Sequence, residues 1–257
     1  MFRLLKLLLS LYSRWLRFVG RTDRLFVMTT LAKRIMPEYR FKWPELDWWE
    51  NSSFTALMDR FDELDGFNMD RRWTISQLMR LVHSVPGDTA ECGVYKGLSS
   101  YIICDRNQQS TSFRRTHYAF DSFAGLSEPG KAEDGSHWHA GDLSVEEQEF
   151  RDNLRPFESS VQVYRGWIPT RFDEVADKRF CFVHIDVDLY QPTKDSMEFF
   201  YDRMSPGGII VCDDYGFGTC PGATRAVDEF LQDKPEKMIS LCSGGGFLIR
   251  GISTSDA

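Results

Sequence analysis

Two apolar segments of the chain, residues 180–187 and 209–212, end in acidic side chains: Asp186 and Asp188 in the first, Asp213 and Asp214 after the second. One predicted helix separates the segments, so we expect neighbouring strands about 4.8 Å apart. The carboxyl ends of such strands meet at the crevice where open α/β sheets bind ligands. Carboxylates gathered there repel one another unless a cation joins them. All-oxygen ligation suits Mg2+, Mn2+ or Ca2+ rather than zinc.

The pair Asp213 and Asp214 sets a condition on this hypothesis. Consecutive residues of a continuing strand point to opposite faces, so joint ligation requires the chain to turn after Cys212. The alternative is that these acids belong to surface loops and cap helices.

A glycine turn precedes the acidic segments. Glu91 to Gly97 reads E-C-G-V-Y-K-G, at the end of a predicted strand and the start of a helix. Gly93 permits a tight turn and the close approach of a ligand, while Gly97 lets the helix start pack closely. The pattern is not G-x-G-x-x-G, so a pyrophosphate cradle is poorly supported and a turn without a ligand is the alternative. Asp121 ends the next strand, where an acid can bind the two ribose hydroxyls of a nucleoside or, equally, cap a turn.

The elements that position these residues alternate between strand and helix, which predicts a mostly parallel sheet covered on both faces. Three glycines at 244–246 predict a hairpin, so the final strand should be antiparallel. This architecture fits the class I methyltransferase (Rossmann-like) fold better than an all-parallel dinucleotide-binding fold. The expected strands are 88–94, 116–120, 161–164, 180–187, 209–212, 238–242 and 247–252, and the expected helices are 71–83, 98–106, one starting near 145, 193–204 and 223–232.

Charge and composition narrow the class of protein. The first 24 residues carry six basic residues and one acidic residue, whereas the rest carry 25 basic and 37 acidic residues. An acidic main part argues against nucleic acid as a partner, because phosphate binding needs a basic surface. No stretch approaches the roughly 20 apolar residues that span a bilayer. Six scattered cysteines without a C-x-x-C pair fit a reduced cytoplasmic compartment.

The N-terminal part predicts an extension, residues 1–60, before a main domain at 61–257. Polar residues recur every three or four positions in 1–26, which is typical of an amphipathic helix. We expect that helix to pack on the main domain or on a second subunit, as in a homo-oligomer; contact with the inner face of an anionic membrane is the alternative. A Trp-rich connector follows at 37–53.

The polar segment 122–144 is expected to form a lid over the site. His137 and His139 are interpreted as loop residues over the site, and His184 as a core histidine within its strand.

Together these motifs resemble the macrocin O-methyltransferase (TylF-type) family over about residues 68–250. The matching segments are E-C-G-V-Y-K-G, F-D-S-F-A-G-L, G-W-I-P, H-I-D-V-D-L-Y-Q-P-T and G-G-I-I-V-C-D-D-Y-G. The resemblance implies a class I fold, S-adenosylmethionine as methyl donor, a sugar hydroxyl as acceptor, and Mg2+. It implies that the metal ligands are Asp186, Asp213 and Asp214, with Asp186 also the general base. We expect Asp188 to lie near these ligands without binding the metal itself. It further implies a cofactor site lined by Glu91, Gly93, Gly97, Asp121 and Ser122.

Two other function classes compete with this interpretation. A metal-dependent hydrolase would use the same aspartates to activate water, but it gives no role to Asp121 or to the Gly93 turn. A binding module, tethered by its N-terminal helix, would bind a nucleoside without catalysis. The acceptor is not defined by these motifs.

Overall fold

The computed structural model describes residues 21–36, 48, 51–64, 68–110 and 112–254, with the backbone alone at 21–25 and 29. The chain divides into two compact units, Met1–Asn51 and Ser52–Ala257. Helix α2 (Arg21–Ile35) belongs to the first unit, and α4 (Ser52–Arg60) begins the second. The helix expected over 1–26 lies outside the described residues up to residue 20, as does most of the connector at 37–53. No helix in the described ranges is long and apolar enough to cross a membrane.

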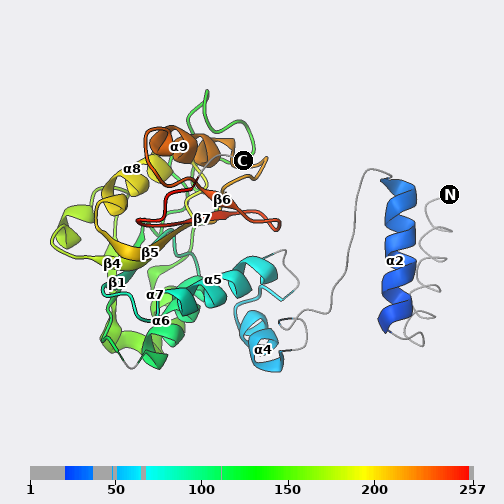
Figure 1. The fold of residues 1–257 in the computed structure, drawn as a ribbon, viewed down its shortest axis with the longest axis horizontal. Helices are drawn as coiled ribbons and strands as arrows, with labels where there is room; N and C mark the ends of the chain where they lie inside the picture. The colour runs from blue at the N-terminus through cyan, green and yellow to red at the C-terminus, as the bar shows by residue number, and fades with distance from the viewer. Residues whose placement is uncertain (1–20, 37–47, 49–50, 65–67, 111, 255–257) are drawn as a thin grey trace. The chain divides into compact units, whose positions relative to one another are not determined.

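The second unit is built on a seven-stranded sheet in the order β3-β2-β1-β4-β5-β7-β6 (Figure 1). The first five of these strands are parallel, and β7 pairs antiparallel with both β5 and β6. This confirms the mostly parallel class I sheet with an antiparallel final strand. The strands are β1 (Asp88–Cys92), β2 (His117–Asp121), β3 (Val161–Arg165), β4 (Phe180–Ile185), β5 (Met204–Cys212), β6 (Ile239–Ser240) and β7 (Gly246–Ile249).

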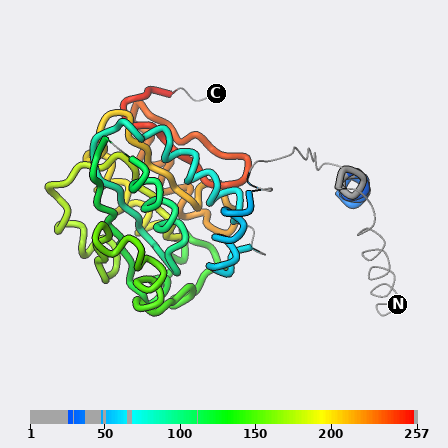
Figure 2. Tube along the Cα trace, turned by 90° about the horizontal axis from the view of Figure 1, so that it is seen from below, coloured from blue at the N-terminus to red at the C-terminus, as the bar shows by residue number. Residues whose placement is uncertain are grey.

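Helices cover both faces of the sheet, with α8 and α9 on one side and α5, α6 and α7 on the other (Figure 1). Two consecutive residues of β2, whose side chains point to opposite faces of the sheet, show how both faces are covered. Phe120 packs with Phe200 of α8, whereas Ala119 packs with Phe150 of α7. The helices are α5 (Met69–Leu81), α6 (Leu98–Gln109), α7 (Glu147–Asn153), α8 (Tyr190–Tyr201) and α9 (Pro221–Leu231), with 3-10 turns at Arg155–Ser160 and Phe172–Val175. The C-terminal end of the described chain lies at the surface (Figure 2).

Strand β5 differs from the expectation, because it begins at Met204 and includes the Pro-Gly-Gly segment that predicted a turn. Phe180 of β4 pairs with Met204, but Phe182 pairs with Ile209, so the register shifts between these pairs. A bulge therefore absorbs the segment within the strand instead of ending it.

The segment 122–144 is fixed to the helices by Asp134, which is buried. Its Oδ1 accepts the Tyr190 backbone N–H at 2.7 Å, and its Oδ2 accepts that of Gly130 at 2.7 Å. Asp134 thus satisfies an N–H at the start of α8, which begins three residues before the expected position. Pro192 is tolerated in this first helical turn because no intrahelical N–H bond is needed there.

Gly222, in the first turn of α9, provides a test of this packing. A Cβ at this position would lie 1.9 Å from Asp134 Oδ1 and 2.9 Å from the Tyr190 backbone nitrogen. Alanine normally stabilises a helix relative to glycine, but here the clash should dominate. We expect Gly222→Ala to lower the free energy of unfolding by about 1–3 kcal/mol in urea denaturation. Gly218→Ala is the matched control, because nothing lies within 4 Å of its Cβ position; equal stability of both variants would contradict the prediction.

Candidate functional site

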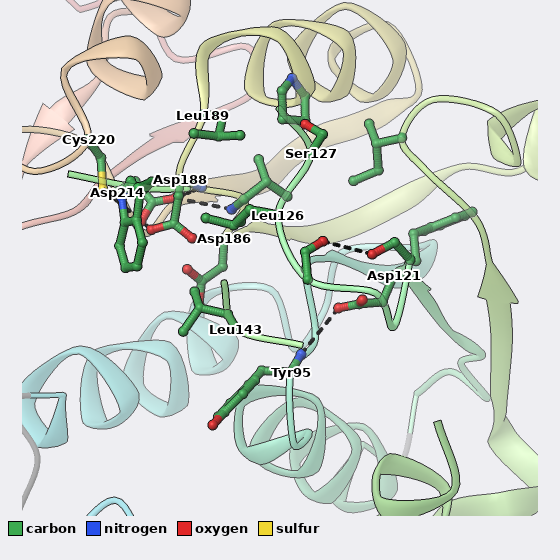
Figure 3. Close-up of a pocket in the computed structure, with 18 of the residues that line it drawn as sticks. Tyr95, Asp121, Leu126, Ser127, Leu143, Asp186, Asp188, Leu189, Asp214 and Cys220 are labelled. Atoms are coloured by element: carbon green, nitrogen blue, oxygen red, sulfur yellow. Dashed lines mark hydrogen bonds between the residues drawn. The ribbon is translucent and has the colours of Figure 1, made fainter. Parts of the chain in front are cut away.

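A cavity of about 560 Å³ lies at the carboxyl ends of β1, β2, β4 and β5 (Figure 3). Asp121 and Tyr95 lie on one side of it, while Asp186, Asp188 and Asp214 lie on the other. Side chains of α5 and of segment 122–144 complete the wall. The sequence-predicted residues that line the cavity are Gly93, Asp121, Ser122, Asp186 and Asp214.

The turn after β1 brings the backbone against β4. Gly93 has a φ of +78°, and a Cβ there would lie 1.8 Å from the Asp186 carbonyl oxygen. Only glycine fits this position, as the motif predicted. The Asp186 N–H donates to the Cys92 carbonyl at 2.9 Å, so the turn is tied directly to the end of β4.

Asp121 holds this turn with its carboxylate. Its Oδ2 accepts the backbone N–H groups of Val94 at 2.8 Å and Tyr95 at 3.3 Å, and its Oδ1 accepts that of Phe123 at 2.7 Å. Burial raises the pKa of Asp121 although these three hydrogen bonds oppose it. A carboxylate has about four acceptor positions, and the described residues fill three of them, so one is left for a ribose hydroxyl. A second ribose hydroxyl would have to replace the long hydrogen bond from Tyr95.

Ser122 shapes the following turn. Its hydroxyl donates to the Gly125 carbonyl at 2.9 Å and accepts the Ala124 N–H at 3.0 Å. The side chain is therefore occupied locally while the residue lines the cavity.

Glu91 lies in the core and not on the cavity wall, which differs from the expected cofactor contact. Its Oε1 accepts from His184 Nδ1 at 2.8 Å and its Oε2 accepts from the Ser100 hydroxyl. Burial favours a raised pKa, but the hydrogen bonds of His117 and His184 outweigh it and lower the pKa of Glu91 to about 2. The side chain is 1% exposed, so its carboxylate is a partner of buried histidines.

Gly97 also lies outside the cavity wall. It has a φ of +93°, and a Cβ would lie 2.6 Å from Leu154 and 2.8 Å from Phe150. In this structure Gly97 allows close packing at the start of α6, as the motif indicates, and the cofactor contact also expected of it stays a prediction.

The strand-end aspartates meet as expected, because β4 and β5 are adjacent and the chain turns directly after Cys212. They form two groups, within each of which the candidate ligand atoms lie within 4.8 Å of one another. Asp214 Oδ2 accepts the N–H groups of Val187 at 3.1 Å and Asp188 at 2.8 Å, which fixes the turn after β4. The predicted trio is divided between the groups, which are His184 with Asp186 and Asp213, and Asp188 with Asp214 and Cys220.

Asp213 is surrounded by cations of the protein. Arg71 Nη1 lies 2.6 Å and Arg72 Nη1 3.3 Å from its Oδ2, and His184 Nε2 lies 3.5 Å from its Oδ1 without forming a hydrogen bond among the described residues. Despite burial, Arg72, His184 and Arg71 hold the pKa of Asp213 far below its usual range. His184 is buried as expected, but Asp213 and Glu91 overcome desolvation and raise its pKa to about 10. It is therefore a charged core histidine.

The pKa values of the other three strand-end acids are shifted in the opposite direction. Burial and the Asp213 charge raise the pKa of Asp186, and burial together with Asp188 and Asp186 raises that of Asp214. Burial likewise raises the pKa of Asp188, although Cys220 Sγ donates to its Oδ1 at 3.4 Å. Burial is the largest cause of all three shifts, and the negative charges of neighbouring aspartates add to it. An additional cation would be stabilised here.

Several side chains of the site carry no signal in the sequence. Arg71 and Arg72 lie on α5, more than 100 residues from the acids they contact. Trp138 Nε1 donates to Cys220 Sγ at 3.4 Å and lines the cavity beside His137. His137 thus lies over the site as expected, whereas His139 is exposed, 3.6 Å from Asp142.

One family model, described as Macrocin-O-methyltransferase (TylF), matches residues 70–240. The chain is 31% identical over 154 residues to 8-demethyl-8-(2,3-dimethoxy-alpha-L-rhamnosyl)-tetracenomycin-C 4'-O-methyltransferase of Streptomyces olivaceus, a match that covers 56% of this chain and 59% of that protein. It is 31% identical over 162 residues to demethyldecarbamoylnovobiocin O-methyltransferase of Streptomyces niveus, covering 58% and 59%. The chain therefore matches about three fifths of the length of these curated relatives.

Solved structures give the same picture of the fold. The O-methyltransferase NovP is 28% identical with a TM-score of 0.59, and the match covers 71% of this chain and 80% of NovP. The calicheamicin methyltransferase CalS11 is 19% identical with a TM-score of 0.64, covering 83% and 100%, which shows a shared fold.

The position of Glu91 predicts a structural and not a cofactor-binding effect of its substitution. Glu91→Gln should lower the free energy of unfolding at pH 7 by about 3–5 kcal/mol, because it breaks a buried charge pair. The folded pKa of Glu91 lies below its usual 4.5, so the stabilisation exists above pH 4.5 and is lost as the pH falls toward 2. The difference in the free energy of unfolding between wild type and Glu91→Gln, measured by urea denaturation, should therefore narrow by roughly 1 kcal/mol from pH 7 to pH 4.

Glu158→Gln, at an exposed glutamate, is the matched control and should leave stability unchanged. Loss of S-adenosylmethionine binding by Glu91→Gln at unchanged stability would instead make Glu91 a cofactor ligand.

Proposed function

The chain belongs to the macrocin-O-methyltransferase (TylF) family, and from this membership we propose that it transfers a methyl group from S-adenosylmethionine to a hydroxyl of a sugar or glycosylated small molecule, with the help of a divalent cation. One observation carries the proposal: Asp121 and Asp186 line the same cavity. A nucleoside-binding acid and a strand-end acid that can act on a hydroxyl thus face one space, which a metal-dependent hydrolase would not need.

The cofactor side of the cavity is proposed around Gly93, Asp121 and Ser122. Gly93 lines the cavity, and the remaining acceptor position of Asp121 suits a ribose hydroxyl. S-adenosylmethionine carries a sulfonium cation, which a wall rich in carboxylates stabilises electrostatically.

The acids opposite fit a divalent cation. The Arg72 guanidinium already lies between Asp186 and Asp213 as a stand-in cation, at 3.4 and 3.3 Å. Carboxylate oxygens are the donors that Mg2+ prefers. We propose that Asp186, Asp213 and Asp214 hold the ion, Asp214 from the adjacent group. Bound there, the ion would lower the pKa of the acceptor hydroxyl and orient a vicinal diol.

Asp186 is the proposed general base. Its side chain is 23% exposed toward the cavity, compared with 4% for Asp213. A general base must reach the proton that it accepts, and Asp186 lines the cavity in which the acceptor hydroxyl would lie. Positioning of the hydroxyl against the methyl group then supplies much of the acceleration.

The rim of the cavity suits an acceptor with an apolar part. Tyr95, Leu143 and Trp167 line it and are 40–46% exposed. The curated relatives act, by their names, on a rhamnosyl-tetracenomycin and on demethyldecarbamoylnovobiocin. We propose that the apolar portion of the acceptor contacts this rim while its sugar reaches the acids.

Segment 122–144 is the proposed lid. Leu126, Trp138 and Leu143 of this segment already line the cavity, and Asp134 anchors the segment to the start of α8. Closure over bound ligands would exclude water from the reacting hydroxyl and the methyl donor.

Calorimetry with S-adenosylmethionine tests the cofactor assignment. We expect binding in the wild type and an increase in Kd of about 10–100-fold in Asp121→Asn, because a hydrogen bond to a charged group is lost. Asp233→Asn, at an exposed acid, is the control and should bind normally. Absence of binding by the wild type at millimolar cofactor would refute the proposed function.

The metal assignment makes a separate prediction. Asp213→Asn combined with Asp214→Asn should abolish Mg2+-dependent turnover of a glycoside acceptor and leave the Kd for S-adenosylmethionine within a few-fold. The reason is that the cofactor is proposed to contact the opposite wall of the cavity. Turnover follows from methyl transfer assays with and without chelator, and parallel loss of turnover and cofactor binding would indicate a folding role.

A further inference from the structure

We propose that Arg72 occupies the cation position between Asp186 and Asp213, and that a divalent ion binds by displacing its guanidinium toward Glu63. Arg72 would then be the residue that sets the metal affinity of the site. This inference rests on the metal-binding part of the proposed function.

The geometry of Arg72 carries the first step. Its Nη1 lies 3.4 Å from Asp186 Oδ2 and 3.3 Å from Asp213 Oδ2, so one nitrogen lies almost equally far from two proposed ligand atoms. The residue is 7% exposed and lines the cavity. A metal ion bound to the same two oxygens would face a like charge at contact distance, in an environment that screens it poorly. The guanidinium and the ion therefore compete for one position.

Glu63 supplies the second step. Its Oε2 lies 3.3 Å from Arg72 Nε, and its side chain is 15% exposed at the cavity wall. The guanidinium can therefore leave Asp186 while keeping an acidic partner. Leaving a buried cation without any partner would be costly. Displacement toward Glu63 avoids that cost.

The neighbouring Arg71 shows the contrasting arrangement. Its guanidinium pairs with Asp213 Oδ2 at 2.6 Å, donates to the Asp213 carbonyl at 3.2 Å and to Asn68 Oδ1 at 2.6 Å, and lies 4.9 Å from the centre of the Phe217 ring. These contacts hold it on one side of Asp213. Arg72, shared between two aspartates at longer distances, is the more readily displaced cation.

Titration of the chain with Mn2+, followed by electron paramagnetic resonance of the free ion, measures this competition without any turnover. Arg72→Met removes the charge and keeps a side chain of similar length. We expect it to bind Mn2+ about tenfold more tightly than the wild type, because no guanidinium has to leave. Arg80→Met, at an exposed position of the same helix, is the matched control and should bind like the wild type.

Glu63→Gln tests the displacement itself and does not depend on whether Arg72→Met folds. With its alternative partner weakened, Arg72 should stay on the aspartates, so Mn2+ affinity should fall several-fold. In the double variant with Arg72→Met this effect should disappear, because no guanidinium is left that could move to the side chain at position 63.

Equal or weaker Mn2+ binding by Arg72→Met, or an unchanged affinity in Glu63→Gln, would overturn the inference. Titration of the same samples with S-adenosylmethionine separates the possible failures. If the cofactor binds but the Mn2+ affinities of the Arg72 and Glu63 variants differ from those expected, only the role of Arg72 is refuted. Cofactor binding with no Mn2+ binding in any variant refutes the role of Arg72 and the metal assignment together, whereas absence of cofactor binding refutes the proposed function.

Discussion

Negative charge buried at the ends of β4 and β5 is the constraint on which the rest of the site depends. Asp186, Asp188, Asp213 and Asp214 follow these two adjacent strands within a few residues, and the last two are almost fully buried. Removing such charges from water costs several kcal/mol per ion unless partners are supplied. Arg71 and Arg72 of α5, the His184 ring and the backbone N–H groups of the turn after β4 supply those partners.

Acidic and basic side chains alternate across the sheet, so the charge balance extends from the strand ends into the core. Glu91 of β1 is paired in register with His184 of β4, and the His184 ring lies between Glu91 and Asp213. Arg72 then approaches Asp213 from α5. Acid, base, acid and base thus follow one another from the core to the cavity wall. Each member keeps its charge because its neighbours are opposite, which explains the lowered pKa of Glu91 and the raised pKa of His184.

The sequence predicted what local patterns and strand order determine. The apolar segments before Asp186 and Asp213 identified buried neighbouring strands, and Gly93 identified a turn that no other residue fits. Contacts between distant segments had no such signal. The pairing of Arg72 with Asp186 spans 114 residues, and the Asp134 contact that starts α8 spans 56. The family resemblance implies Glu91 as a cofactor contact, whereas the structure places its carboxylate beside His184 in the core. The motif marks the end of the strand but does not show which face the side chain takes.

The two central aspartates, although neighbours, are suited to different tasks. Asp213 is 4% exposed and lies beside Arg71, Arg72 and His184, which together hold its pKa far below the usual range. Among the described residues Asp186 forms an ion pair with Arg72 alone; its side chain is 23% exposed, and burial and Asp213 raise its pKa. When the surroundings of two neighbouring acids shift their pKa values in opposite directions, the acid with the lowered pKa stays charged and the other can accept a proton. In the proposed reaction Asp213 would remain a fixed charge that organises the cations, and proton transfer would fall to Asp186, the more exposed of the two acids.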